Sequence, residues 1–168
     1  MKYYRFEPHC SGDYGQNTVY VGEKTAHPCV VSHLHYEFCR WPKDDFICCL
    51  FHFIGRDRLR QTLEALRPPV TGIEFAEVEV SGDDQEFKHV WRKERPDSDL
   101  GKWYWFKITG KAGIDDFGVV PAAKLVVSER VLQVLDRFTT PESVREFWEW
   151  QGEIKPPGVP QKDSPATS

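Results

Sequence analysis

Cysteine and histidine are the residue types in this chain with the clearest potential for chemistry. All five cysteines and five of the six histidines lie within the first 52 residues. Thiolate sulfur and imidazole nitrogen are ligands that Zn²⁺ prefers in proteins, so this part of the chain is compatible with a structural or regulatory zinc site. The candidate ligands are Cys10, Cys29, His33, His35, Cys39, Cys48, Cys49 and His52.

The spacing of these residues favours a simpler role. No Cys-x2-Cys pair is present, and the neighbours Cys48 and Cys49 would point to opposite faces of a strand. Buried free cysteine commonly packs as a small hydrophobic side chain. A cysteine nucleophile paired with a histidine is less favoured still, because nothing specifies an oxyanion site. We therefore predict no metal and no cofactor, and keep zinc binding by the N-terminal Cys/His cluster as the alternative function.

Two pairs of adjacent aspartates recur in the chain. Asp44-Asp45 and Asp115-Asp116 each directly precede a phenylalanine, at a predicted turn. Paired carboxylates can hold a hard cation or face a basic protein surface, whereas aspartate at a turn more commonly satisfies local backbone donors. Neither pair has a neighbouring nucleophile, phosphate loop or acid-base partner, so we predict that the protein is not an enzyme.

Tryptophans alternate in two short segments. Trp103 and Trp105 would share one face of a strand, as would Trp148 and Trp150. Such rings could stack on single-stranded nucleic acid, but only beside a basic groove. Core packing is favoured, with a protein interface as the second interpretation.

The charge balance argues against nucleic-acid binding, because it supplies no basic surface for phosphates. The 168 residues contain 22 Lys and Arg against 26 Asp and Glu, which gives a formal net charge of -4 and a pI near 5.9.

No stretch approaches the roughly 20 apolar residues that cross a bilayer, and the first residues lack the apolar core of a signal peptide. The odd set of five cysteines has no regular disulfide spacing. We expect a cytoplasmic protein that binds neither nucleic acid nor membrane.

A self-comparison aligns two segments of the chain. Residues 53–66 lie over 125–138 at an offset of 72, and the Asp-Asp-Phe sequences align at an offset of 71. We interpret the alignment as an internal duplication of a strand-helix-strand unit, with copies at about 44–80 and 115–150.

Each copy contains the pattern of a strand, a helix and a returning strand. The apolar run 46–54 is typical of one strand buried on both faces. Apolar residues at i, i+4 and i+7 then predict a helix in each copy, with Ser128 as the N-cap of the second. Residues 72–80 predict a returning strand, and 141–150 fit either a strand or a helix start, of which the repeat favours the strand.

The remaining segments complete the predicted organisation. Residues 102–109 predict a further strand, 81–101 a charged connection, and the first 40 residues an irregular segment with one or two strands. Residues 151–168 carry four prolines and predict a disordered tail. The fold class expected over 1–150 is a single α+β domain, with a mixed sheet covered by two helices and built from two pseudo-duplicated strand-helix-strand units.

Three short motifs resemble a known protein family. They are Trp41-Pro-Lys-Asp-Asp-Phe, Thr71-Gly-Ile-Glu-Phe-Ala-Glu-Val-Glu-Val and Leu125-Val-Val-Ser-Glu-Arg. Together they resemble the bacterial immunity-protein domains of polymorphic toxin systems, formerly a domain of unknown function, over roughly residues 28–150. The resemblance implies a small, non-catalytic cytosolic protein that binds and neutralises a cognate toxin made by the same cell.

The resemblance assigns no toxin-binding residue, because such interfaces diversify with their partners. An acidic inhibitor suits a basic enzyme cleft, since complementary charge speeds encounter and fixes register. The predicted partner-binding residues are therefore Asp44, Asp45, Asp115 and Asp116, with Trp41 as a nearby anchor.

Overall fold

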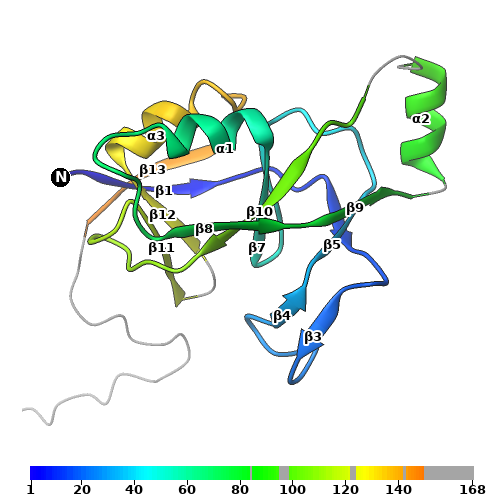
Figure 1. Ribbon diagram of the computed structural model, residues 1–168, viewed down its shortest axis with the longest axis horizontal. Coiled ribbons are helices and arrows are strands. Elements are labelled where there is room, and N and C mark those ends of the chain that lie inside the picture. Colours follow the sequence, from blue (N-terminus) through cyan, green and yellow to red (C-terminus); the bar gives the residue numbers. More distant parts are fainter. Residues whose placement is uncertain (84, 95–98, 122–123, 142, 150–168) are drawn as a thin grey trace, which may run out of the picture.

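The computed structural model describes residues 1–149 apart from 84, 95–98, 122–123 and 142. This part of the chain is mostly β-strand and forms two four-stranded sheets, a three-stranded sheet, a two-stranded ribbon and three helices (Figure 1). The predicted α+β fold with one mixed sheet covered by two helices is therefore wrong. Strands distant in sequence pair with one another, and local patterns do not encode such pairings. The predicted tail 151–168 and Trp150 lie outside the described residues.

The first four-stranded sheet is antiparallel, with the strand order β6-β7-β10-β8. Its strands are β6 (Phe46–Cys49), β7 (His52–Arg56), β8 (Ile73–Glu77) and β10 (Trp103–Ile108). The predicted strand at 102–109 is confirmed by β10, which lies in the interior of this sheet.

The second four-stranded sheet has the order β11-β12-β1-β13 and is also antiparallel. It contains β1 (Tyr3–Glu7), β11 (Phe117–Val120), β12 (Lys124–Ser128) and β13 (Val144–Trp148). Within residues 141–150, the strand interpretation is confirmed over Val144–Trp148 by β13. The first strand of the chain thus lies between two of its last strands.

The two sheets repeat one arrangement. Each has a hairpin, then a helix, then a strand at the far edge. The first sheet has β6-β7-α1-β8, where α1 is Asp57–Glu64, and the second has β11-β12-α3-β13, where α3 is Glu129–Leu135. In each sheet a strand from elsewhere lies between the hairpin and the edge strand. That strand is β10 in the first sheet and β1 in the second. In the chain, β10 directly precedes the β11-β12 hairpin, whereas β1 is separated from the β6-β7 hairpin by the strands of residues 12–38.

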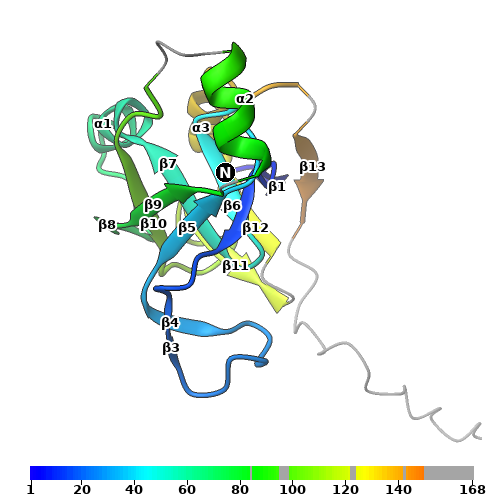
Figure 2. The same cartoon turned by 90° about the vertical axis from the view of Figure 1, so that its right-hand side faces the viewer.

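The N-terminal 40 residues contain more regular structure than the one or two strands expected. Besides β1, they form β2 (Gly12–Tyr14), β3 (Val19–Val21), β4 (Val30–His33) and β5 (His35–Phe38). The three-stranded sheet has the order β2-β5-β9, where β9 is Glu79–Gly82, and its β5-β9 ladder is parallel. The ribbon of β3 and β4 projects away from helices α1 and α3 (Figures 1 and 2).

The apolar run 46–54 is a hairpin instead of the single strand predicted. The chain reverses at Leu50, which is exposed and has a positive φ of 49°. A leucine rarely adopts this left-handed conformation, and the run contains no glycine, asparagine or proline before residue 55 to signal a turn. Residues 72–80 are likewise divided, because β8 pairs in one sheet and β9 in another.

Both faces of the first four-stranded sheet are buried, which explains its uninterrupted hydrophobicity. One face packs with helices α1 (Asp57–Glu64) and α3 (Glu129–Leu135) in a core that includes Phe46, Phe53 and Phe106. The other face packs with the three-stranded sheet in a second core, which includes Trp103 and Trp105. The prediction that these tryptophans pack in the core is confirmed.

Helix α2 (Glu86–Glu94) falls in the segment expected to be a charged connection. Its first turn is held by the Asp83 carboxylate, which accepts hydrogen bonds from the backbone N–H groups of Gln85 and Phe87 at 3.2 and 2.9 Å. Phe87 is buried and packs against Trp91 at i+4. An aspartate just before the helix, followed by this aromatic spacing, was the signal that could have identified the helix.

Ser128 caps α3, as its sequence position predicts. Its Oγ accepts from the N–H of Val131 at 3.5 Å and donates to Asp116 Oδ1 at 2.7 Å, and the residue is fully buried. We expect Ser128→Ala to lower the free energy of unfolding by about 1–2 kcal/mol, measured by urea denaturation. Gln133→Ala, at an exposed position of the same helix, is the control and should change it by less than about 0.5 kcal/mol. Equal effects of the two substitutions would show that the cap does not contribute.

Candidate interaction surface

Asp116 lies inside the fold, where it links the two halves of the protein. The residue is 5% exposed. Its carboxylate accepts hydrogen bonds from Arg130 Nε at 2.8 Å and from the N–H of Thr71 at 3.0 Å, in addition to the bond from Ser128. Burial alone would raise the pKa of Asp116, but the hydrogen bonds from Arg130, Ser128 and Thr71 outweigh it and lower that pKa.

Asp44 and Asp45 are also closed inside the fold, at 1% and 4% exposure. Asp44 accepts from the N–H of Thr140 at 2.7 Å and from Ser143 Oγ at 3.2 Å. Asp45 pairs with Arg58 through two hydrogen bonds and lies 3.3 Å from Arg56 Nε. All three buried carboxylates thus have internal partners, so their side chains are not available to a basic surface.

The other two predicted partner-binding residues lie apart from these networks. Asp115 is partly exposed and accepts from the N–H of Lys111 at 2.7 Å. Trp41 is half-buried and stacks on Phe87 of α2, with ring centroids 5.9 Å apart. The five predicted residues therefore do not form one surface, and we do not place the binding site on them.

The N-terminal cysteines and histidines make separate contacts with different parts of the fold. His35 bonds to Ser81 Oγ at 2.7 Å, and His33 Nε2 lies 2.8 Å from Glu79. Cys48 packs toward the first core and Cys49 toward the second, which confirms that they face opposite ways. Among the described residues, no three His, Cys, Asp or Glu side chains come together as metal ligands.

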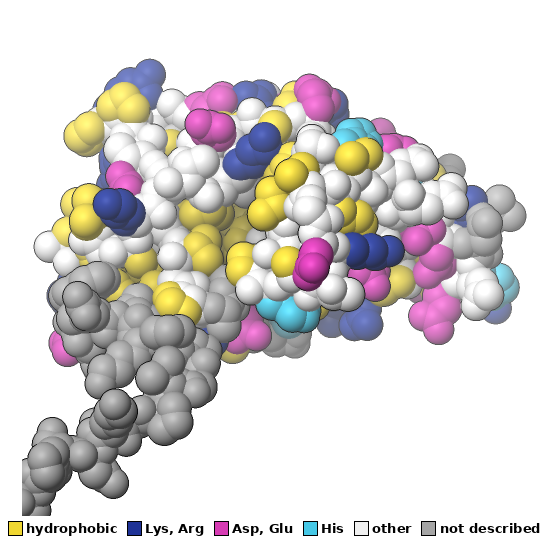
Figure 3. Space-filling model, turned by 90° about the horizontal axis from the view of Figure 1, so that it is seen from below, with side chains coloured by type: hydrophobic (Ala, Val, Ile, Leu, Met, Phe, Trp, Pro, Cys, Tyr) yellow, Lys and Arg dark blue, Asp and Glu magenta, His cyan; other side chains and the backbone are white. Residues whose placement is uncertain are grey.

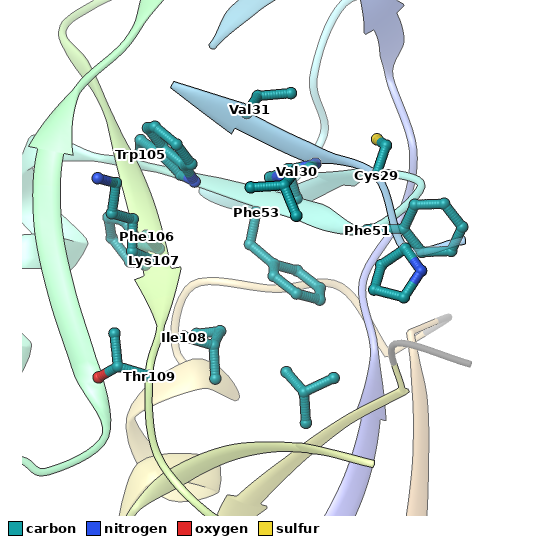
Figure 4. A pocket seen from close by; sticks show the side chains of 13 residues that line it. Cys29, Val30, Val31, Phe51, Phe53, Trp105, Phe106, Lys107, Ile108 and Thr109 are labelled. Atoms are coloured by element: carbon teal, nitrogen blue, oxygen red, sulfur yellow. The ribbon is translucent and has the colours of Figure 1, made fainter. Parts of the chain in front are cut away.

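An apolar groove of about 370 Å³, formed by several elements, opens on the described surface. It lies where the ribbon, the β6-β7 hairpin, β10 and β11 meet, and Val30, Phe53 and Ile108 converge on it (Figure 4). Sequence reasoning missed the groove because its walls come from four separate segments. The lining residues are Pro28, Cys29, Val30, Val31, Phe51, His52, Phe53, Trp105, Phe106, Lys107, Ile108, Thr109 and Val119.

Exposed valines extend the groove onto the ribbon. Val30 is 57% exposed and pairs across the ribbon with Val21, which is 54% exposed. The next pair, Tyr20 and Val31, faces the protein interior because side chains alternate along a strand. Val119 of β11, which also lines the groove, is exposed as well. Figure 3 shows hydrophobic side chains gathered around the hollow on this face of the molecule.

The polar groups in the groove are held by internal contacts. The Tyr14 hydroxyl lies 2.6 Å from His52 Nδ1, and the Cys29 thiol donates to that hydroxyl at 3.5 Å. Burial lowers the pKa of His52 to about 4, so the ring is neutral at physiological pH, and a neutral imidazole nitrogen can accept a hydrogen bond from the Tyr14 hydroxyl. The Lys107 ammonium lies 4.3 Å from the centre of the Trp105 ring. This arrangement suits the binding of apolar side chains, with few polar groups to orient them.

Comparison of the chain with known protein families, curated proteins and solved structures finds no match. Within the described residues, the helices are all too short or too polar to cross a bilayer. The function must therefore be argued from the site itself and from the motifs described above.

Proposed function

We propose that this protein is a non-catalytic, cytoplasmic immunity protein that binds a cognate bacterial toxin through the apolar groove and the adjoining ribbon. The observation that carries the proposal is the exposed pair Val21 and Val30, which continues into a groove lined by aromatic rings. Exposed apolar patches of this kind mark protein interaction sites. The resemblance of the Trp41, Thr71 and Leu125 motifs to immunity proteins supports the same class of function.

The partner should present an apolar side chain on a basic surface. The groove offers rings and aliphatic carbons to the apolar side chain, while the net charge of -4 favours approach of a cationic protein. In such an interface the apolar anchor supplies the affinity, whereas the charge mainly raises the association rate.

The test uses the protein encoded by the gene next to that of this chain. That protein is expressed in a bacterial host with and without this chain, and binding of the two purified proteins is measured by calorimetry. We expect growth arrest that this chain relieves, together with a one-to-one complex. The absence of either toxicity or a complex would overturn the proposed function.

A substitution on the ribbon locates the interface. Val30→Asp should weaken the complex by about 10-fold or more, because it places a charge in a desolvated apolar contact. Val90→Asp, at an exposed position of α2, is the control and should leave the affinity unchanged. Equal affinities of both variants and the unmodified protein would remove the groove from the interface while leaving the immunity function in place.

A further inference from the structure

Cys10 and Cys48 are brought together by an isolated pairing of two distant segments. Cys10 follows β1, Cys48 lies in β6, and the two residues form a parallel β-bridge outside the named ladders. The N–H of Cys48 donates to the carbonyl of His9 at 2.9 Å and fixes this register. Paired strands lie about 4.7–4.9 Å apart, which is inside the range of Cα separations that a disulfide spans.

The two thiols differ in accessibility and in acidity. Cys10 is exposed, whereas Cys48 is half-buried. The thiol of Cys48 lies 3.4 Å from the carbonyl oxygen of Pro8. A hydrogen bond from the Cys48 thiol lowers the pKa of Cys10 to about 6, and burial opposes it only in part. The same contact, with burial, raises the pKa of Cys48. The accessible cysteine is thus the one that carries the reactive thiolate.

We propose that Cys10 and Cys48 are a thiol-disulfide exchange site for small disulfides of the glutathione type. The Cys10 thiolate attacks one sulfur of the small disulfide, forms a mixed disulfide and expels one thiolate. Cys48 then loses its proton to solvent and attacks the Cys10 sulfur, which expels the second thiolate. Two protein thiols are oxidised to one disulfide, and the small disulfide is reduced to two thiols.

The disulfide would fasten the two halves of the protein to each other. Residues 8–10 continue directly from β1 in the second sheet, and Cys48 belongs to β6 in the first. Closing the loop between residues 10 and 48 restricts the unfolded chain, so the oxidised protein should melt roughly 5–15 °C higher than the reduced protein.

The experiment equilibrates the reduced full-length protein with buffers of defined ratios of oxidised to reduced glutathione. Free thiols are then blocked with N-ethylmaleimide, and intact mass and peptide mapping are recorded. We expect two fewer blocked cysteines, a mass lower by two hydrogen atoms before blocking, and one cross-linked peptide pair that contains Cys10 and Cys48. A pair that involves Cys39 or Cys49, or no pair at all, overturns the proposal.

Single substitutions separate the two steps. Cys48→Ser should stop at the mixed disulfide, with one glutathione attached to Cys10. Cys10→Ser is at an exposed position, so its fold is retained, and it should form neither species. Cys39→Ser is the matched control and should oxidise like the unmodified protein. Oxidation of Cys10→Ser at the same glutathione ratio would contradict the proposal even if the other variants were unstable.

Discussion

Replacing Asp116 with alanine should lower the free energy of unfolding by about 3 kcal/mol, because the partners of this buried carboxylate would be left without it. Arg130 would lose its paired charge, and Ser128 and the backbone of Thr71 would each lose a hydrogen-bond acceptor. The value is set near the lower end of the range for buried ion pairs because the Arg130 side chain is 28% exposed. The measurement is the urea midpoint with an unchanged slope.

The adjacent Asp115→Ala variant is the control for this prediction. Asp115 is partly exposed and accepts one backbone hydrogen bond, so its loss should cost less than about 1 kcal/mol. If both alanine variants unfold at the same urea concentration, the Asp116 network does not hold the halves together.

The lowered pKa of Asp116 also fixes the direction of a pH effect. The stabilisation from its ionised form is fully present above the ordinary aspartate pKa of about 3.9 and is lost as the pH falls through the lower pKa of the folded protein. The unmodified protein should therefore lose stability on acidification below about pH 4 more steeply than Asp116→Asn. Parallel acid profiles of the two proteins would contradict this assignment.

Replacing Trp103 with alanine should cost about 3–5 kcal/mol, the range for removing a fully buried tryptophan from a core. The ring is 1% exposed. The centre of its ring lies 5.4 Å from the centre of the Phe38 ring. The guanidinium carbon of Arg56 lies 4.7 Å from the centre of the Trp103 ring. Its Nε1 donates to the carbonyl of Leu100 at 2.9 Å. Alanine would leave a cavity on one face of the first four-stranded sheet.

Trp41→Ala provides the comparison within the same core. Trp41 packs at the edge of that core and is half-buried, so we expect at most about half the loss that Trp103→Ala causes. Thermal or urea unfolding of both variants measures the difference. An equal loss would mean that burial does not distinguish the two rings.

Local signals in the sequence were sufficient to predict single elements. Ser128 precedes an acidic residue and an apolar helical stripe, and the structure has the N-cap there. The alternating aromatic residues of 103–106 likewise form a strand with both faces buried. These features depend on residues within a few positions of one another, so they can be read along the chain.

Features that depend on distant segments could not be predicted in this way. The turn at Leu50 is imposed by pairing and packing, since the local residues offer no turn signal. The burial of Asp45 and Asp116 is a partial exception, because arginines 58 and 130 occupy aligned positions in the two repeats. That recurrence could have indicated internal ion pairs. The sequence contains no comparable recurrence that would have indicated the groove, whose lining comes from separate segments.

The position of β1 between β12 and β13 imposes an order on folding during synthesis. Residues 3–7 are synthesised more than 110 residues before their ladder partners, which lie at 124–128 and 144–148. Both edges of β1 therefore lack their ladder partners while the hairpin and helix of the first half are synthesised. The second sheet closes only after translation has passed residue 148, so the nascent chain carries an unpaired edge through most of its synthesis, when association with another chain is most favoured.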